Sequence, residues 1–327
     1  MTSPSAGKVA LITGANTGIG KELARQLAER HDVARIYLAG RSKAKLDAAR
    51  SDLAAATGRD VFSVAVIDLT DLTSVHAAVR SLPERLDWLV MNAGGAGGKT
   101  PLARTASGAT TVLAANVIGH IALLDDLIAA GKLAGTAVYA GSEAARGVRK
   151  LRIPRPHFAT TSADELATVI DGTFFANHKF AATLGYAQAK YIGALAIAAE
   201  ARRHPDQRIL TMSPGGTRGT DAARDMNPLA RFGYEKVLMR LITPALRLSH
   251  SVRVGTKRHV DALDDPGYTS GVFYASTART LTGPVVDQAT IFPDLANRSF
   301  QDNAYQAVRR FITPTADEHH TTTAAEH

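Results

Sequence analysis

The chain has 327 residues, of which 45% are hydrophobic, and this length can bury the core of one large domain or of two. It contains no cysteine, which excludes disulfides, cysteine nucleophiles and thiolate metal sites and fits a reducing cytoplasm. The net charge of +8 is compatible with nucleic acid, an anionic surface or an acidic ligand. The basic residues are scattered and no nucleic-acid motif occurs, so we expect no nucleic-acid partner.

Hydropathy along the chain indicates neither a membrane span nor a targeting leader. No apolar run approaches the roughly 18 residues that a transmembrane helix needs, and no charged-then-apolar leader opens the sequence. We therefore expect a cytoplasmic protein without a transmembrane segment.

The first predicted elements are a buried strand over residues 9–12, a glycine-rich turn over 13–20 and then a helix. The strand is an unbroken apolar run, typical of a parallel sheet covered on both faces, and the helix repeats an apolar residue every four positions from Ile19. Glycines on such a turn permit a tight bend and a close approach to a ligand, while the helix N-terminus attracts a pyrophosphate. The predicted cofactor-binding residues of this turn are Thr13, Gly14, Asn16, Thr17, Gly18, Ile19 and Gly20.

The second strand, over 34–39, ends where the two nicotinamide dinucleotides can be distinguished. An acidic residue at this point binds the ribose 2′-hydroxyl of NAD, whereas an arginine accommodates the 2′-phosphate of NADP. No Asp or Glu is present, and Arg41 offers a planar guanidinium beside the hydroxyl of Ser42. The sequence thus favours NADP(H) over NAD(H), although a solvated basic helix start would by itself explain Lys43 and Lys45.

The third and fourth strands also end at polar or small residues. The third strand, over 61–67, ends at Asp68 and Leu69, and this aspartate can cap the helix that follows. The fourth strand, over 86–91, leads into a glycine-rich loop that begins with Asn92, Ala93 and Gly94.

Two polar residues precede the acid–base pair described next. A long helix over about 108–132 carries Asn116, whose poor helix propensity indicates a role beyond helix formation; packing between helices is the alternative. The fifth strand ends at 138–141, and Ser142 follows it where ligands of parallel sheets bind.

Tyr186 and Lys190 are four residues apart on a predicted helix over 182–203, so their side chains lie on one face, one turn apart. A phenol has a pKa of about 10, and a nearby cation favours the phenolate and lowers that pKa. Tyr186 could then act as a general acid near neutral pH. The alternative is a chance pair in which a long lysine stem packs beside a half-buried tyrosine.

These motifs occur in an order that resembles the short-chain dehydrogenase/reductase family. The Gly-x3-Gly-x-Gly turn, the Asn-Ala-Gly after the fourth strand, the serine, the Tyr-x3-Lys pair and a Pro-Gly turn after the sixth strand match it over about residues 8–311. The segment 116–124 resembles the branch of retinol dehydrogenases and protochlorophyllide reductases. Met91 departs from the family's Asn-Asn-Ala-Gly pattern.

The resemblance implies a Rossmann-type α/β fold, doubly wound, with a mostly parallel seven-stranded sheet and helices on both faces. It implies that Tyr186 is the general acid/base, that Lys190 lowers its pKa and binds the ribose, and that Ser142 polarises the carbonyl. Asn116 would order a relay water, and Asp68 would lie beside the adenine. The cofactor-binding residues implied outside the glycine turn are Arg41, Ser42, Asp68, Leu69, Asn92, Ala93, Gly94, Tyr186, Lys190, Pro214, Gly215 and Thr217.

Residues 143–181 separate the serine from the tyrosine by more than the family pattern allows. The segment holds a basic run over 146–155, which a solvated face or contact with an acidic group would explain, and then several phenylalanines. Because both of its ends adjoin predicted catalytic residues, we expect a lid or wall of the pocket, and the phenylalanines indicate a bulky apolar substrate.

We predict a single NAD(P)-binding domain over 1–312, with a substrate-covering helical region at about 219–251 and a flexible tail over 313–327. The helical region is basic and amphipathic and could instead contact a membrane surface or another subunit, so a monomer and a homo-oligomer both stay open. The remaining predicted elements are a sixth strand over 209–212, a last strand over 271–274 and a closing helix over 303–311.

The expected function is that of an NADP(H)-dependent oxidoreductase that transfers hydride between the nicotinamide and a carbonyl or alcohol of a lipophilic small molecule. The alternatives are a non-catalytic NADP(H)-sensing or scaffold protein and a C=C reductase like protochlorophyllide reductase, which in the family uses a cysteine that this chain lacks. No metal site is expected, because the eleven histidines show no ligand spacing on a helix.

Overall fold

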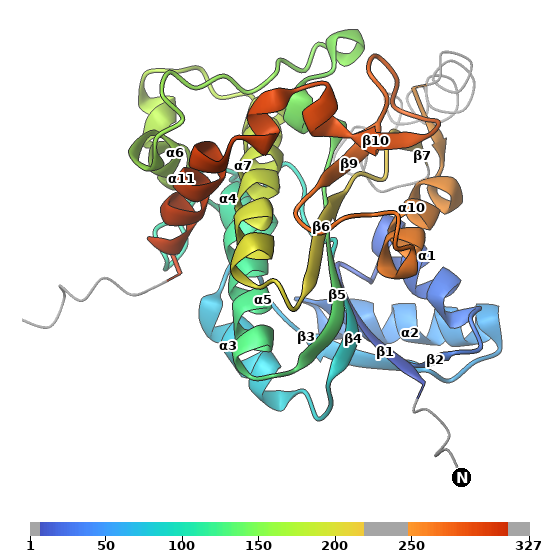
Figure 1. Cartoon of the computed structure of the whole chain (residues 1–327). Helices are drawn as coiled ribbons and strands as arrows, with labels where there is room; N and C mark the ends of the chain where they lie inside the picture. The colour runs from blue at the N-terminus through green and yellow to red at the C-terminus, as the bar shows by residue number, and fades with distance from the viewer. Residues whose placement is uncertain (1–6, 219–247, 313–327) are drawn as a thin grey trace, which may run out of the picture.

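The computed structural model describes residues 7–218 and 248–312, which form one large sheet with helices on both faces (Figure 1). The sheet has eight strands in the order β10-β9-β6-β5-β4-β1-β2-β3, and only the β10·β9 pair is antiparallel. The order reverses between β1 and β4, which gives the predicted doubly wound topology. The strands are β1 Lys8–Thr13, β2 Val33–Gly40, β3 Phe62–Val66, β4 Leu86–Met91, β5 Leu133–Ala140, β6 Arg208–Met212, β9 Phe273–Ser276 and β10 Val285–Asp287.

Alternate residues of β1 pack into different helical layers. Val9 and Leu11 belong to one cluster of buried side chains, and Ala10 and Ile12 belong to the other. The unbroken apolar run therefore marks a strand covered on both faces, as predicted. The first cluster is completed by α3 Leu72–Ser81, α5 Gly119–Ala129, α7 Ala182–Arg203 and α11 Arg298–Arg309, and the second by α1 Gly18–Ala28, α2 Lys43–Thr57 and α10 Val252–Asp264.

The predicted fold class is confirmed, and the differences concern short or irregular elements. Strand β10 makes the sheet eight-stranded instead of seven-stranded; with only three residues it has too little pattern to be recognised. The closing helix α11 begins at Arg298, because Asn297 caps it by accepting the N–H of Phe300. The predicted helical region at 219–251 lies, up to residue 247, outside the described residues, and the predicted tail over 313–327 lies outside them entirely.

Several described elements were not predicted at all. Helix α10 is one of them, and another is α6 Ala163–Asp171, which lies within the insertion over 143–181. The other unpredicted elements are the paired strands β7 Thr217–Arg218 and β8 His250–Ser251 and the single turns η2 Glu143–Arg146, η3 Arg149–Leu151, η4 Thr173–Ala176, η7 Gln288–Thr290 and η8 Pro293–Ala296.

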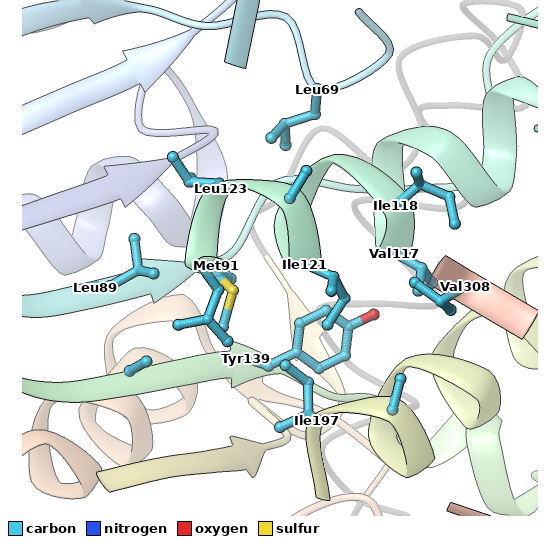
Figure 2. Packing of buried hydrophobic residues seen from close by; sticks show 14 of the residues in the cluster. Leu69, Leu89, Met91, Val117, Ile118, Ile121, Leu123, Tyr139, Ile197 and Val308 are labelled. Carbon is cyan, nitrogen blue, oxygen red and sulfur yellow. The ribbon is translucent and has the colours of Figure 1, made fainter. Parts of the chain in front are cut away.

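The long helix predicted over 108–132 runs from Thr111 to Ala129 and is interrupted by a π-helical turn. It comprises α4 Thr111–Leu113, η1 Ala114–Ile118 and α5. This stretch is the one helix among the described residues that is long and apolar enough to cross a membrane, but 72% of its apolar window is buried in the protein. Figure 2 shows Ile121 of this helix beside the ring of Tyr139, and Ile118 and Leu123 belong to the same buried cluster as Tyr139 and Met91 of the sheet, which identifies it as a core helix.

Candidate active site

The carboxyl ends of four neighbouring strands bring the sequence motifs together. β1 ends at Thr13, β4 at Met91, β5 at Ala140 and β6 at Met212, and these strands lie side by side. Because the strands are parallel, the segments that follow them emerge at one edge of the sheet. The glycine turn, the Asn-Ala-Gly segment, the predicted catalytic serine and the Pro-Gly turn therefore share that edge.

The glycine turn has a backbone that other residues adopt only with strain. Gly14 and Gly18 have φ angles of 67° and 54°, in the left-handed region. A Cβ on Gly20 would lie 2.4 Å from the carbonyl oxygen of Gly14, so α1 can begin directly against the turn only with glycine there. Thr17 is the N-cap residue of α1, and the first turn of this helix has no acidic residue. The backbone N–H groups of that turn can therefore bind an anion.

Thr13 fastens the glycine turn to the segment that follows β4. Its buried hydroxyl accepts the N–H groups of Asn92 and Ala93 at 2.8 and 2.9 Å, and the Asn92 amide donates to the Thr13 carbonyl oxygen at 2.9 Å. His120 on α5 lies 2.9 Å from the same hydroxyl, and burial lowers the pKa of His120 to about 3. The two segments therefore form one rigid cradle, and the unusual Met91 is buried in the core.

Asn116 braces the loop after β4. Its side-chain amide donates to the carbonyl oxygens of Gly95 and Val112 at 2.8 and 2.7 Å, and its Oδ1 accepts the N–H of Gly95 at 3.2 Å. Its own carbonyl oxygen accepts the hydroxyl of Tyr139 at 2.9 Å. The side chain is thus satisfied by packing between elements, the alternative considered above, while its role in ordering a relay water stays a prediction.

Ser142, Tyr186 and Lys190 converge at the same edge of the sheet. Ser142 follows β5 and lies close enough to Tyr186 on α7 to lower the pKa of its phenol. The Nζ atom of Lys190 lies 5.6 Å from the centroid of the Tyr186 ring and donates to the carbonyl oxygen of Ala140 at 2.8 Å. A Cβ on Gly94 would lie 3.5 Å from this Nζ, so the loop after β4 reaches the cluster. The structure therefore brings the three predicted catalytic side chains together beside the glycine cradle.

Burial dominates the acid–base properties of this cluster. Burial raises the pKa of Tyr186, the hydrogen bond with Ser142 lowers it, and the negative charge of Glu143 raises it. Burial also lowers the pKa of Lys190 to about 7, so its ammonium group is only partly populated at neutral pH. The lowered phenol pKa predicted from Lys190 is therefore wrong for the protein alone, because burial weakens the very cation that was expected to cause it.

The predicted adenosine end of the site is basic. Arg41 is exposed, and within residues 7–218 and 248–312 no ion pair joins it to a carboxylate; Ser42 next to it is the N-cap residue of α2. Asp68 accepts the N–H and hydroxyl of Thr70 at 2.9 and 2.7 Å. Its predicted alternative as a helix cap is wrong, because Asp71 caps α3. The remaining predicted residues here are Asn16, which faces Gly40 at the end of β2, and Leu69, whose side chain is buried in the core.

The Pro-Gly turn after β6 is held by the C-terminal part of the chain. Gly215 has a φ of 77°, and a Cβ there would lie 2.5 Å from the carbonyl oxygen of Leu281. The carbonyl oxygen of Pro214 lies 2.7 Å from Nε2 of His250, and Thr217 pairs with His250 in the small sheet. The predicted nicotinamide end of the site thus depends on His250 and Leu281, which follow Gly20 by 230 and 261 positions in the sequence.

The basic run at 146–155 is only partly solvated. Arg146 is buried and donates to the carbonyl oxygens of Ser276, Thr277 and Thr280, so the solvated-face interpretation is wrong for this residue. Arg155 forms an ion pair with Asp294. The exposed members of the run are Arg149, Lys150, Arg152 and Arg155.

The rest of the insertion is packed against the body of the protein. Helix α6 contacts α11, and the hydroxyl of Thr110 donates to the carbonyl oxygen of Ile170 at 3.0 Å. Phe175 lies 5.0 Å from Phe180 between ring centroids, and a Cβ on Gly185 would lie 2.7 Å from the Phe180 ring. An aromatic wall therefore adjoins the residue that precedes Tyr186.

Three potential metal ligands that were not predicted lie away from this site, one on α5 and two at the C-terminal end of α7. Ligand atoms of Asp125, Glu200 and His204 lie within 4.8 Å of one another, and Glu200 and His204 have the i, i+4 spacing of one helix face. Arg309 already pairs with Asp125, which neutralises part of the cluster. Glu200 follows Tyr186 by fourteen positions, about 21 Å along a helix, so the cluster takes no part in the candidate active site.

The fold, the glycine cradle and the Ser-Tyr-Lys cluster define a dinucleotide-binding protein of the Rossmann type. A family model described as short chain dehydrogenase matches residues 8–151. A short-chain dehydrogenase/reductase of Armillaria gallica is 34% identical over 236 residues, which cover 68% of this chain and 69% of that protein. The chain belongs to the short-chain dehydrogenase/reductase family.

Shorter and structural similarities agree with this assignment. Retinol dehydrogenase 12 of Bos taurus is 42% identical over 120 residues, and the chain covers 37% of the length of that relative. Retinol dehydrogenase 11 of Mus musculus is 40% identical over a stretch of the same length, and the predicted relation to the retinol dehydrogenase branch is confirmed. An NADPH-bound carbonyl reductase from chicken fatty liver, 16% identical, has a TM-score of 0.55 over 85% of this chain and 99% of its own, which shows the shared fold.

Proposed function

We propose that the protein is an NADP(H)-dependent oxidoreductase that interconverts a carbonyl and an alcohol on a lipophilic small molecule. The convergence of Ser142 and Tyr186, with Lys190 one helical turn from the tyrosine, carries the proposal. Family membership supports the reaction class. The exposed Arg41, which forms no ion pair within the described residues, and the lack of an Asp or Glu at the end of β2 support NADP(H). The proposed location is the cytoplasm, and both a monomer and a homo-oligomer are compatible with it.

The cradle fits such a cofactor on steric grounds. The left-handed glycines Gly14 and Gly18 carry no side chain over the first turn of α1, whose N–H groups would hold the diphosphate. Arg41 and Ser42 would hold the 2′-phosphate at the end of β2. Lys190 would bind the ribose, since its Nζ already reaches the loop after β4. The bound cofactor would supply the hydride donor or acceptor.

The chain's own residues would orient the substrate and handle the proton. The Ser142 hydroxyl would donate to the substrate carbonyl oxygen, while the Tyr186 hydroxyl would give that oxygen a proton during reduction and take it back during oxidation. The ammonium group of Lys190 would stabilise the Tyr186 phenolate that remains after this proton transfer. The aromatic wall of Phe175 and Phe180 would exclude water and contact an apolar substrate.

NADPH oxidation with a panel of lipophilic ketones and aldehydes tests the proposal. We expect turnover with at least one compound, a preference for NADPH over NADH, and a loss of turnover in Tyr186→Phe with NADPH binding retained. A Tyr186→Phe variant that turns over like the wild type would overturn it. Tight NADPH binding without turnover on any panel member would instead support the sensing or scaffold alternative.

A further inference from the structure

A buried carboxylate stands directly beside the predicted catalytic serine. Glu143 follows Ser142 in the chain, begins the turn η2 and is 4% exposed. Buried carboxylates are costly unless their oxygens are satisfied by donors. The contacts of the Glu143 side chain therefore show which groups stabilise this buried carboxylate.

Both oxygens of Glu143 are occupied by donors from other segments. Oε2 accepts the hydroxyl of Ser213, and Oε1 accepts the N–H and the hydroxyl of Ser276 at 3.1 and 2.9 Å. The guanidinium of Arg258 on α10 lies 3.7 Å from Oε1. Every one of these groups donates, so the arrangement suits an ionised carboxylate balanced by a buried arginine.

The two serines differ in what they hold. The Ser213 hydroxyl, while donating to Glu143, accepts the N–H of Gly215 at 3.1 Å and so fixes the Pro-Gly turn. Ser276 lies at the end of β9, and its hydroxyl accepts from Arg258 at 3.0 Å. Ser213 therefore contacts the Pro-Gly turn directly, whereas Ser276 reaches it only through Arg258, which donates to the carbonyl oxygen of Ser213 at 3.2 Å.

We propose that Glu143 is a positioning residue that couples the serine–tyrosine cluster to the nicotinamide end of the cofactor site through Ser213. This inference rests on the proposed function. Among the described residues, the charged or titratable groups near Tyr186 include Glu143 from η2, Lys190 from its own helix and Tyr139 from β5. Removing the negative charge of Glu143 lowers the pKa of Tyr186, because that charge disfavours the phenolate.

A matched pair of serine variants tests the coupling. Ser213→Ala and Ser276→Ala each remove one hydroxyl from Glu143, and NADPH binding is measured by fluorescence titration, which needs no turnover. We expect Ser213→Ala to weaken NADPH binding about fivefold, the loss of roughly one hydrogen bond, and Ser276→Ala to leave it within about twofold. Equal weakening in both variants, or none in Ser213→Ala, would overturn the coupling.

Glu143→Gln tests the charge and keeps the shape of the side chain. We expect the ionisation of Tyr186, followed by tyrosinate absorbance as the difference from Glu143→Gln carrying Tyr186→Phe, to shift to lower pH than in the wild type. An unchanged ionisation in folded Glu143→Gln would overturn the charge role. Should Glu143→Gln fail to fold, Arg258→Gln tests the same pair from the other side: it leaves the carboxylate uncompensated and should move the ionisation to higher pH. Absent turnover in the wild type would refute the proposed reaction but leave both measurements valid.

Discussion

The two halves of the candidate site are built by different means. The half predicted to bind the phosphates is formed by consecutive residues whose backbone shape depends on glycine, as at Gly14 and Gly18. The half beside the tyrosine is formed by side chains that come together from distant segments, with Glu143, Arg146 and Arg258 as buried charges. A site of the first kind is visible as a local motif, whereas one of the second kind emerges only when the chain has folded.

The match to the family model follows the same division. The family model matches residues 8–151, which contain the whole glycine cradle and end inside the insertion. The residues that hold Glu143 in place lie beyond this match, directly after β6, on β9 and on α10. The relative from Armillaria gallica aligns over 236 residues, so its similarity extends past the cofactor half.

Gly20→Ala should have the largest effect, by disrupting the half of the site that is predicted to bind the phosphates. Its Cβ would lie 2.4 Å from the Gly14 carbonyl oxygen and 2.7 Å from Nδ2 of Asn92, so the turn or the helix must move. We expect NADPH binding to weaken by roughly a hundredfold, measured by fluorescence titration. Gly58→Ala is the control, since it adds a methyl group at a glycine with a φ of 66° but with open space around its Cβ. Comparable NADPH binding in the two variants would contradict the cradle.

Arg146→Ala should break the other half. The buried guanidinium donates to three carbonyl oxygens, and its removal takes one donor from each of them, at a cost of about 3 kcal/mol in the free energy of unfolding. Arg155→Ala removes an exposed ion pair with Asp294 from the same basic run and should cost about 0.5 kcal/mol. Urea denaturation of both variants measures the difference, and similar midpoints would show that Arg146 is not structural.

Arg41→Ala should weaken the use of NADPH much more than the use of NADH. Loss of a charged hydrogen bond to the 2′-phosphate is expected to raise the KM for NADPH about 30-fold. The KM for NADH should stay within about twofold, because NADH lacks that phosphate. Steady-state kinetics with each cofactor distinguishes this result from a general loss of binding, in which both values rise together.

His120→Gln should have a smaller, pH-dependent effect where the two halves meet. Burial lowers the pKa of His120 to about 3, below its ordinary value, so the unfolded chain binds a proton that the folded protein refuses. This histidine therefore removes stability as the pH falls below about 6.5. We expect His120→Gln to lose about 2 kcal/mol less than the wild type between pH 6.5 and pH 4.5. Parallel acid-denaturation curves for the two proteins would contradict this assignment.

Features that a local sequence pattern determines, such as the bounds of helices and strands, could be predicted. Features that depend on tertiary contacts, such as the burial of a charged side chain, could not. Helix α7 has the predicted bounds, and strand β4 does too, because each has a clear period or run with matching ends. Arg146 has the composition of a solvated residue, and no pattern marks the three carbonyl oxygens that surround it. The phenol pKa was mispredicted for the same reason: the spacing of Tyr186 and Lys190 gives their proximity but not their burial.

The most direct test of the account follows a deuterium atom from the cofactor to the product. NADPH with deuterium in both hydrogen positions at C4 of the nicotinamide is incubated with the wild type and the best carbonyl substrate, and the alcohol is analysed by mass spectrometry. The account predicts one deuterium on the former carbonyl carbon, and none when Tyr186→Phe replaces the wild type. An alcohol formed without deuterium on that carbon, or label found across a reduced C=C bond, would contradict it.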